Sequence, residues 1–386
     1  MHHFISDSTW DASGVMDKVA KDVSKALPKQ KLTGLLIDES GWEKKGDKSV
    51  GVGHQYCGNV GKTANSQVAV FGCLCNDKYA SLIDARLYLP KAWTDDKERC
   101  DQAQIPLDAR EFKTKPELAL EIIKHQVSNG IAFDYVGGDG LYWNDFNLAQ
   151  GIDELCLLYI LDIHSNQQVY LERPQLYIPE RKSNRGRAPK RLRADVEPTK
   201  VNDYIEDLDG SQWKKLDIRH SAKGVLKAHF HFKKVYVWDK NTDQVQSRLL
   251  VVSKRKNKTG VEIKYSFSNA NVEQYTKTAI AQMQAQRFFI EHSFKEQKQV
   301  LKMDQFQTRK WLSWYHQMAL NMMVGAFLLH EKLFNKDDVP LLPARDIMDF
   351  LISQFYKGMT EEGMLKRLQK RHHIRQNDIN RYYSRE

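Results

Sequence analysis

The spacing between apolar residues changes several times along the chain, and each change predicts a different element of secondary structure. Near the N-terminus four apolar residues recur at helical spacing, namely Val15, Val19, Val23 and Leu27. We expect an amphipathic helix there, with Asp11 or Ser13 as its cap and Pro28 at its end. Continuous apolar runs then indicate buried strands. These strands are predicted at residues 32–38, 50–57, 67–75 and 81–89.

The next part of the chain alternates strands with helices. A helix is predicted at 116–128, followed by a strand at 131–138, a short helix at 145–152 and a buried strand at 155–162. An antiparallel meander that continues as strand, helix and strand is the layout of a ribonuclease H-like α/β domain with a mixed sheet. That fold still needs a closing helix after its last strand.

A stretch of different character, residues 165–265, precedes the obvious candidate for this closing helix. It contains a cationic run with Gly and Pro at 181–193 that cannot pack a core, so we expect an exposed basic arm. The cations of this arm are Arg181, Lys182, Arg185, Arg187, Lys190, Arg191 and Arg193. Strand-like pieces follow at 228–238, 249–253 and 261–266, which makes the stretch a β-rich insertion.

The predicted closing helix covers residues 280–301, which contain no Gly or Pro. At about 100° per residue, four polar side chains fall within about 60° of one another beside an apolar stripe. They are Gln284, Arg287, Glu291 and Lys298. Such a row suits a site that handles an anion and holds a metal ion with one carboxylate. Charge pairing between residues four apart on a surface helix explains the same row equally well.

Five segments follow from these changes of pattern. They are an N-terminal helical segment (1–30), the first part of the ribonuclease H-like domain (31–164), the β-rich insertion (165–265), the closing helices of that domain (266–330) and a basic helical C-terminal segment (331–386).

Charge narrows the class of partner. The chain of 386 residues carries 59 Lys and Arg against 49 Asp and Glu, which favours nucleic acid or an anionic surface. No apolar run is long enough for a membrane span, and the N-terminus resembles neither a signal nor a transit peptide. We therefore expect a cytoplasmic protein that faces nucleic acid and not a membrane. The five cysteines have no regular spacing, so core thiols are favoured over disulfides or a zinc site.

Three acids are placed to hold metal. Asp38 and Asp139 end predicted strands, and ligands of α/β sheets bind outside such strand ends. The closing helix would bring Glu291 to the same point. Three carboxylates without a thiol select Mg²⁺ or Mn²⁺, and two such ions stabilise both oxygens of an in-line phosphoryl displacement. Arg287 and Lys298 would then hold phosphates on either side of the cut.

Each of these acids also has an ordinary structural explanation, because Asp is common in turns and helix caps. Three further acids compete for the same role. Asp134 lies inside its strand and Glu296 points to another side of the helix, so both fit less well. Glu39 is adjacent to Asp38, and the pattern does not separate the two.

Several motifs carry a family resemblance. They are Leu36-Ile-Asp38-Glu-Ser-Gly-Trp-Glu-Lys-Lys-Gly46, Ser49-Val-Gly-Val-Gly-His-Gln55-Tyr56-Cys-Gly58-Asn-Val-Gly61-Lys62, Asp139-Gly-Leu-Tyr142, Arg187-Ala-Pro189 and Arg287-x-x-x-Glu291-x-x-Phe294-x-x-x-Lys298. With these motifs the chain resembles bacterial insertion-sequence transposases of the DDE class, of the insertion sequence seven-oh-one type. The resemblance covers most of residues 4–330 and is most specific over 36–62.

The resemblance implies a ribonuclease H-like (retroviral integrase-like) catalytic domain with a β-strand insertion before the glutamate helix. It also implies Asp38, Asp139 and Glu291 as the metal-binding triad for two Mg²⁺ or Mn²⁺ ions. Related transposases carry a Tyr three residues before the Arg of the glutamate helix, where this chain has Gln284. The resemblance therefore does not carry over a DNA hairpin intermediate. Family members usually have more sequence before His3, so we expect part of an N-terminal helical region to be missing.

The function that the resemblance implies is DNA transposition: Mg²⁺-dependent cleavage at the ends of an insertion sequence and strand transfer into target DNA. The implied partners are double-stranded terminal inverted repeats and target DNA, bound by a homodimer that joins the bacterial nucleoid. Two alternatives stay open. One is a catalytically silent DNA-binding remnant that acts as a repressor, and the other is a general ribonuclease H-like nuclease.

Overall fold

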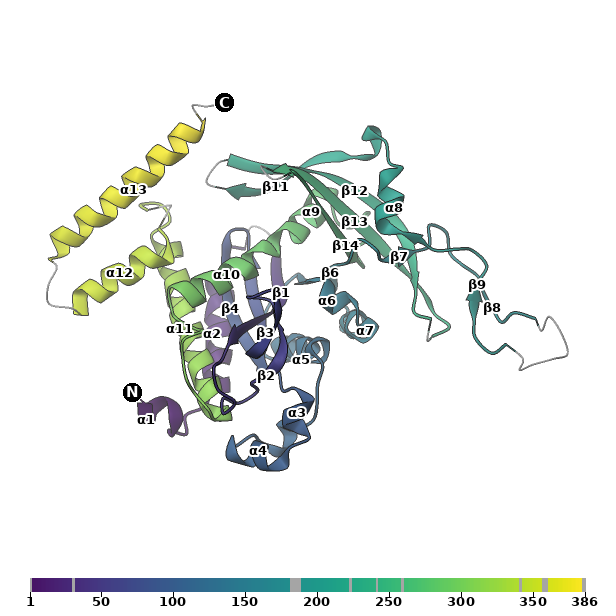
Figure 1. Ribbon diagram of the computed structural model, residues 1–386. Coiled ribbons are helices and arrows are strands. Elements are labelled where there is room, and N and C mark those ends of the chain that lie inside the picture. Colours follow the sequence, from purple (N-terminus) through teal and green to yellow (C-terminus); the bar gives the residue numbers. More distant parts are fainter. Residues whose placement is uncertain are drawn as a thin grey trace. The chain divides into compact units, whose positions relative to one another are not determined.

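The protein is described by a computed structural model that covers residues 2–29, 32–180, 189–221, 224–240, 242–257, 260–339, 342–355 and 360–383 (Figure 1). The chain forms two compact units. Unit 1 consists of Met1–Asp134, His220–Gly224 and Gln286–Glu386, and unit 2 consists of Tyr135–Arg219 and Val225–Ala285. Both units combine a β-sheet with helices, so the protein is of the mixed α/β class. No helix among the described residues is both long and apolar enough to cross a membrane.

The sheet of unit 1 is antiparallel and is built on strand β3. Its strands are β1 (Thr33–Glu43), β2 (Gly53–Cys57), β3 (Lys62–Asn76) and β4 (Tyr79–Leu87). Strand β1 pairs with β3 from Thr33↔Asn76 to Glu43↔Ser66. Along its other edge, β3 pairs with β2 through one half and with β4 through the other. The predicted antiparallel start of the fold is confirmed.

Strand β1 does not end at Asp38, as the acid and the following Gly suggested. It continues for five more residues to Glu43, so Asp38 lies in the middle of the strand, opposite Phe71. The physical reason is close packing at Gly41. A Cβ atom there would lie 3.0 Å from Cγ2 of Val68 and 3.2 Å from Sγ of Cys57. The Gly therefore lets the strand stay paired in a crowded place and does not mark a turn.

Helices cover both faces of this sheet. On one face, a Cβ atom at Gly72 would lie 2.9 Å from Ile122 of helix α5 (Lys115–Ser128). On the other face, Phe71 packs edge-on against Phe294 of helix α10 (Phe288–Gln299), with ring centroids 5.3 Å apart. The thiol of Cys73 lies 3.7 Å from the Ser293 hydroxyl of the same helix.

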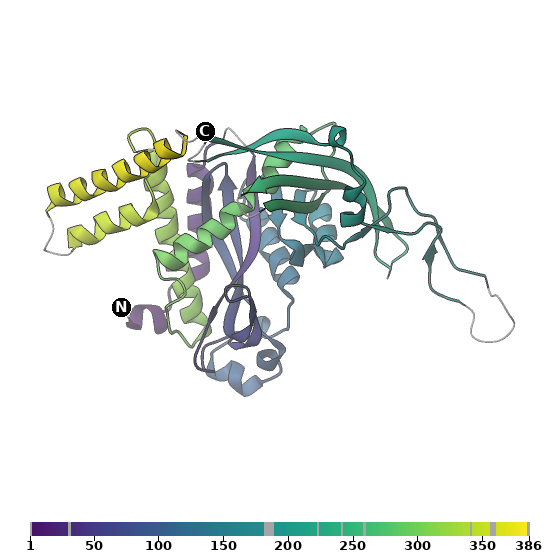
Figure 2. The ribbon, with the colours of Figure 1, turned by 45° about the horizontal axis from the view of Figure 1, so that its top comes forward.

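Helices α2 (Ala12–Ala26) and α11 (Trp311–Phe334) lie side by side in unit 1 and pack against β4 (Figure 2). Asp11 caps α2 and Thr114 caps α5, as expected from the sequence. The remaining helical elements of unit 1 are α1 (His2–Ser6), α3 (Lys91–Thr94), α4 (Lys97–Gln102), η1 (Leu107–Ala109), α12 (Ala344–Phe355) and α13 (Glu361–Tyr383).

Unit 2 contains a large mixed sheet. Strands β5 (Tyr135–Gly138) and β6 (Leu158–Asp162) are parallel, and α6 (Gly140–Trp143) and α7 (Phe146–Glu154) connect them. Strand β14 (Gly260–Ser268) is antiparallel to β6, and β13 (Val245–Asn257) and β12 (Gly224–Trp238) continue the sheet (Figure 1). The three strands predicted in the insertion are thus present, and each is longer than expected.

Short elements complete unit 2. They are β7 (Gln168–Val169), β8 (Leu176–Tyr177), β9 (Arg193–Ala194), β10 (Thr199–Lys200), α8 (Val201–Glu206), η2 (Gly210–Gln212), β11 (Lys214–Ser221), which extends into unit 1, and α9 (Lys277–Gln286), whose last residue lies in unit 1.

The predicted helix 280–301 is two helices, α9 and α10, and Arg287 lies between them. Arg287 keeps helical backbone angles (φ −52°, ψ −30°) but belongs to neither helix. The break has a tertiary cause, because each helix is fixed by its own unit. In unit 2 the buried Gln284 amide donates to the Ser266 hydroxyl (2.8 Å) and to the Val251 carbonyl (3.3 Å). Gln284 is therefore not part of the polar row with Glu291 and Lys298.

Candidate metal centre on strand β1

Asp38 is directed toward the face of the sheet that α10 covers. Paired residues of antiparallel strands place their side chains on the same face, and Asp38 pairs with Phe71, which packs on Phe294. One carboxylate oxygen, Oδ1, accepts a hydrogen bond from the Glu39 amide at 2.8 Å. The other, Oδ2, lies 3.7 Å from Nη1 of Arg287. A largely buried carboxylate thus faces a cation of the glutamate-helix region.

Arg287 contacts two acids at once. Besides Asp38, its guanidinium reaches Glu291, with Nη2 and Oε1 2.9 Å apart. The guanidinium is largely buried, whereas about half of the Glu291 side chain is exposed. The charge pair between residues four apart is therefore present, and the metal-binding explanation of the polar row stays a prediction. Arg287 and Glu291 form a pair four residues apart, and the pair lies beside the acid of β1.

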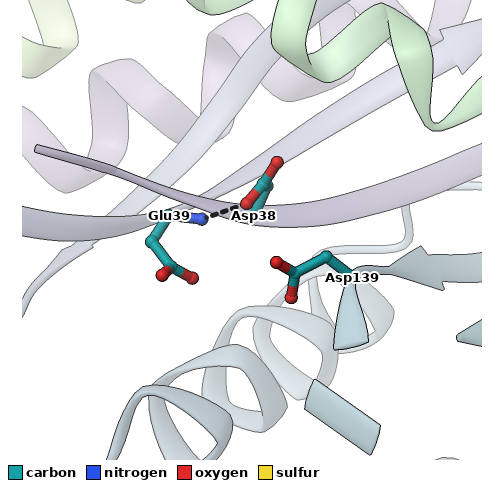
Figure 3. A group of neighbouring side chains, drawn as sticks. All are labelled: Asp38, Glu39 and Asp139. Atoms are coloured by element: carbon teal, nitrogen blue, oxygen red, sulfur yellow. Dashed lines mark hydrogen bonds between the residues drawn. The ribbon is translucent and has the colours of Figure 1, made fainter. Parts of the chain in front are cut away.

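Asp38, Glu39 and Asp139 form an acidic group (Figure 3). One carboxylate oxygen from each lies within 4.8 Å of the others, and no second group of this kind occurs among the described residues. Oxygens that share one Mg²⁺ or Ca²⁺ at about 2.0 to 2.6 Å lie at most about 5 Å apart, so the spacing fits a common ion. Three carboxylates without nitrogen or sulfur ligands suit a hard divalent cation.

Two acids of this group, Asp38 and Asp139, were named from the sequence, and the third, Glu39, was left open beside Asp38. Asp139 directly follows β5, as predicted, and also caps α6 by accepting from the Leu141 amide at 3.0 Å. Glu39, which the sequence could not separate from Asp38, is in the group. Glu291 is not among its members.

The model of the DDE superfamily endonucleases matches residues 1–225. The chain belongs to this superfamily. A probable transposase for insertion sequence element IS701 from Microchaete diplosiphon is 35% identical to it over 172 residues, which are 44% of this chain and 41% of that protein. The chain thus matches less than half the length of that relative. In this DDE superfamily member, Asp38 and Asp139 lie inside the range matched by the family model, and Glu291 lies beyond it.

Lys298 was predicted to hold a phosphate. In this superfamily member its ammonium donates to the Gly41 carbonyl of β1 at 3.1 Å, three residues beyond Asp38 along the strand. Burial lowers the pKa of Lys298, and the nearby Asp304 carboxylate partly opposes this effect. Its role toward phosphate stays a prediction.

Lys115 is a site residue that the sequence did not reveal. It begins α5, and its ammonium lies 3.1 Å from Oε1 of Glu39. Side chains alternate between the two faces of a strand, so Glu39 is directed toward α5 while Asp38 is directed toward α10. No sequence pattern links residues 39 and 115, because their contact depends on how α5 packs on the sheet.

Two residues at and just beyond the end of β6, Asp162 and His164, were also missed. Strands β5 and β6 are parallel with Gly138 opposite Leu161, so Asp162 ends its strand level with Asp139. Asp162 accepts a hydrogen bond from the Ser266 hydroxyl at 2.6 Å, and Ser266 in turn accepts one from Gln284. The exposed His164 imidazole lies 3.5 Å from the place that a Cβ atom on Gly140 would take.

The basic arm is only partly described. Four of its predicted DNA-binding cations lie outside the described residues: Arg181, Lys182, Arg185 and Arg187. The other three, Lys190, Arg191 and Arg193, are exposed, and Arg193 belongs to β9.

Lys44 follows β1 and is buried. Its ammonium donates to the Phe306 carbonyl at 2.6 Å and lies 4.7 Å from the centre of that ring. Burial lowers the pKa of Lys44 from 10.5 to about 8, against the opposing effect of Asp304. Between these two pKa values the unfolded chain binds more protons than the folded one. The free energy of unfolding therefore rises with pH across this window.

We expect Lys44→Met to remove this pH dependence. The free energy of unfolding of the wild type, minus that of the variant, should rise by on the order of 2 kcal/mol as the pH is raised through the window. Urea unfolding at a series of pH values measures it. Lys45→Met, at the exposed neighbouring position, is the control and should show no such rise. A constant difference for Lys44→Met would contradict the assignment.

Proposed function

We propose that this chain is a transposase that cuts DNA at the ends of an insertion sequence and joins the freed 3′ ends to target DNA. The observation that carries the proposal is the acidic group with Asp38 and Asp139 in a member of the DDE superfamily endonucleases. The name of the relative from Microchaete diplosiphon, a probable transposase for an insertion sequence, points in the same direction.

We infer a ribonuclease H-like (retroviral integrase-like) catalytic domain, in which Asp38, Asp139 and Glu291 hold two Mg²⁺ ions. Mn²⁺ has the same preference for oxygen ligands and could replace Mg²⁺. Bound there, the ions would supply the charge that stabilises the attacking and leaving oxygens of the phosphodiester. Water and later the 3′-hydroxyl are the nucleophiles, and no covalent enzyme intermediate is needed. Arg287 and Lys298 are the proposed phosphate contacts.

The proposed partners are the terminal inverted repeats of the element and the target DNA, both double-stranded. The formal net charge of +10 supports an anionic partner. We propose that a homodimer binds the two ends together in the bacterial cytoplasm, where DNA binding places it on the nucleoid.

A cleavage assay tests this function. The substrates are DNA duplexes carrying the sequences that flank the coding region, and matched duplexes in which those sequences are scrambled. We expect Mg²⁺-dependent nicking at the element ends and no nicking of scrambled ends or in EDTA. Equal cutting of both duplexes would favour a general nuclease. Binding of the element ends without nicking would favour a repressor.

We expect the basic arm to bind DNA phosphates. We replace Arg185, Arg187, Lys190 and Arg191 by Gln. The negative slope of log K, the DNA-binding constant, against log salt concentration should then become less steep by about 0.9 for each phosphate that the arm no longer neutralises. Fluorescence anisotropy with labelled duplexes at several salt concentrations measures it.

The control for the arm is Lys366→Gln, because the exposed Lys366 ammonium is 2.7 Å from Glu362 and already has an acidic partner. Its salt slope should equal that of the wild type. An unchanged slope in the arm variant would show that the arm does not hold DNA.

A further inference from the structure

We propose that Arg287 is an internal cation that competes with the metal for Asp38 and Glu291, and that metal ions bind only after its guanidinium has left them. The proposal rests on the proposed function, since it takes these two acids as metal ligands. In this proposal Arg287 limits metal binding until DNA is present.

The contacts that carry this inference lie within unit 1. The guanidinium places Nη2 2.9 Å from Oε1 of Glu291 and Nη1 3.7 Å from Oδ2 of Asp38. It therefore lies between a ligand from the strand and a ligand from the helix. Glu291 is drawn to Arg287 and stays outside the acidic group of Asp38, Glu39 and Asp139. The guanidinium contact thus accounts for the one proposed ligand that does not join the others.

The charge of Arg287 makes the competition unavoidable. A guanidinium stays protonated in proteins, so it cannot release the carboxylates by losing its proton and must move away. The Arg287 and Asp38 side chains are largely buried, 19% and 12% exposed, so water screens their attraction weakly. A metal ion that needs the same oxygens must displace the guanidinium, and its apparent affinity falls by the fraction of molecules in which the oxygens are available.

A DNA phosphate is a suitable second partner for the displaced guanidinium. Arg binds phosphate oxygens through two parallel hydrogen bonds as well as it binds carboxylates. A DNA phosphate near the site would therefore draw Arg287 away from Asp38 and Glu291 and leave both acids to the metal. By linkage, bound metal would strengthen the contact with the phosphate by the same factor. Metal loading and DNA binding would then support each other through one side chain.

Metal titration tests the competition without any DNA cleavage. The probe is Mn²⁺, titrated calorimetrically into the full chain without DNA. We expect Arg287→Gln to bind Mn²⁺ about tenfold more tightly than the wild type, because no internal cation remains to be displaced. Arg287→Lys should give an intermediate affinity, since an ammonium keeps the charge but lacks the fork that reaches two carboxylates.

Lys332→Gln is the matched control. Lys332 pairs with Glu296 of α10 at 2.6 Å, and the two side chains are 20% and 29% exposed, so this variant removes a similarly buried ion pair near the same helix. It should bind Mn²⁺ as the wild type does. Equal tightening in Lys332→Gln and Arg287→Gln would show a general effect of charge and would overturn the proposal.

Thermal unfolding shows whether the Arg287→Gln chain is folded. Without metal, Arg287→Gln should unfold at a lower temperature than the wild type, since two neighbouring carboxylates lose their counter-charge. The rise in its unfolding temperature on adding Mn²⁺ should exceed that of the wild type. A folded Arg287→Gln chain whose Mn²⁺ affinity is unchanged or weaker overturns the proposal.

Asp38→Asn distinguishes a failure of the proposed competition by Arg287 from a failure of the proposed metal site. Loss of Mn²⁺ binding in Asp38→Asn together with no tightening in Arg287→Gln would reject the competition and keep the metal site. Unchanged Mn²⁺ binding in Asp38→Asn would reject the metal site itself, and with it both the proposed function and the role of Arg287.

Discussion

Asp38→Asn is expected to lower the rate of DNA cleavage by about a thousandfold and to leave DNA binding nearly unchanged. The amide has the shape of the carboxylate and keeps an oxygen that can accept from the Glu39 amide. What it loses is the negative charge that a divalent cation requires. Single-turnover cleavage of an element end measures the rate, and anisotropy with the same duplex measures binding.

The control for this prediction is Asp134→Asn. Asp134 accepts from the Thr33 amide at 2.7 Å and therefore anchors the start of β1. Its replacement should leave cleavage within a few-fold of the wild type. Asp139→Asn should behave like Asp38→Asn, because Asn caps a helix as well as Asp and the loss cannot be assigned to α6. Full-rate cleavage by either variant would remove that residue from the proposed triad.

Glu291→Gln is expected to reduce cleavage by about a hundredfold or more, whereas Glu39→Gln should have a much smaller effect. This comparison decides between two acids, because the acidic group contains Glu39 while the proposed triad contains Glu291. Both variants keep the size of the side chain and remove one charge. Cleavage rates at saturating Mg²⁺ and at a series of lower Mg²⁺ concentrations measure the effect.

Glu296→Gln is the control on the same helix. It removes the partner of Lys332 and should affect stability more than cleavage. If Glu39→Gln were the severe variant and Glu291→Gln the mild one, Glu39 would replace Glu291 as the third ligand. That outcome would also reject the proposed competition of Arg287 with the metal for Glu291.

Local patterns predicted local geometry well. The spacing of Arg287 and Glu291 by four residues is enough to bring them together, and the structure has them in contact. Likewise, the cap at Thr114 and the strands of the insertion depend on short-range sequence. These features need no knowledge of the packing of distant segments.

What the sequence did not predict depends on tertiary contacts. Strand β1 continues past Asp38 because β3 offers pairing partners as far as Ser66. The break at Arg287 arises because Gln284 is bound by the strands of unit 2. Lys115 and Glu39 are 76 positions apart, and only the packing of α5 brings them together. Sequence spacing carries no information about such contacts.

The interior position of strand β3 has a consequence for chemical modification. Cys73 and Cys75 lie on this strand with no exposed surface, and burial raises the pKa of the Cys73 thiol to about 12. Reagents for thiols attack the thiolate, so at neutral pH they are kept from Cys73 both by exclusion and by protonation. The exposed Cys156 has no such protection by burial. The rate at which Cys73 is alkylated therefore measures how often the central strand of unit 1 opens by local unfolding.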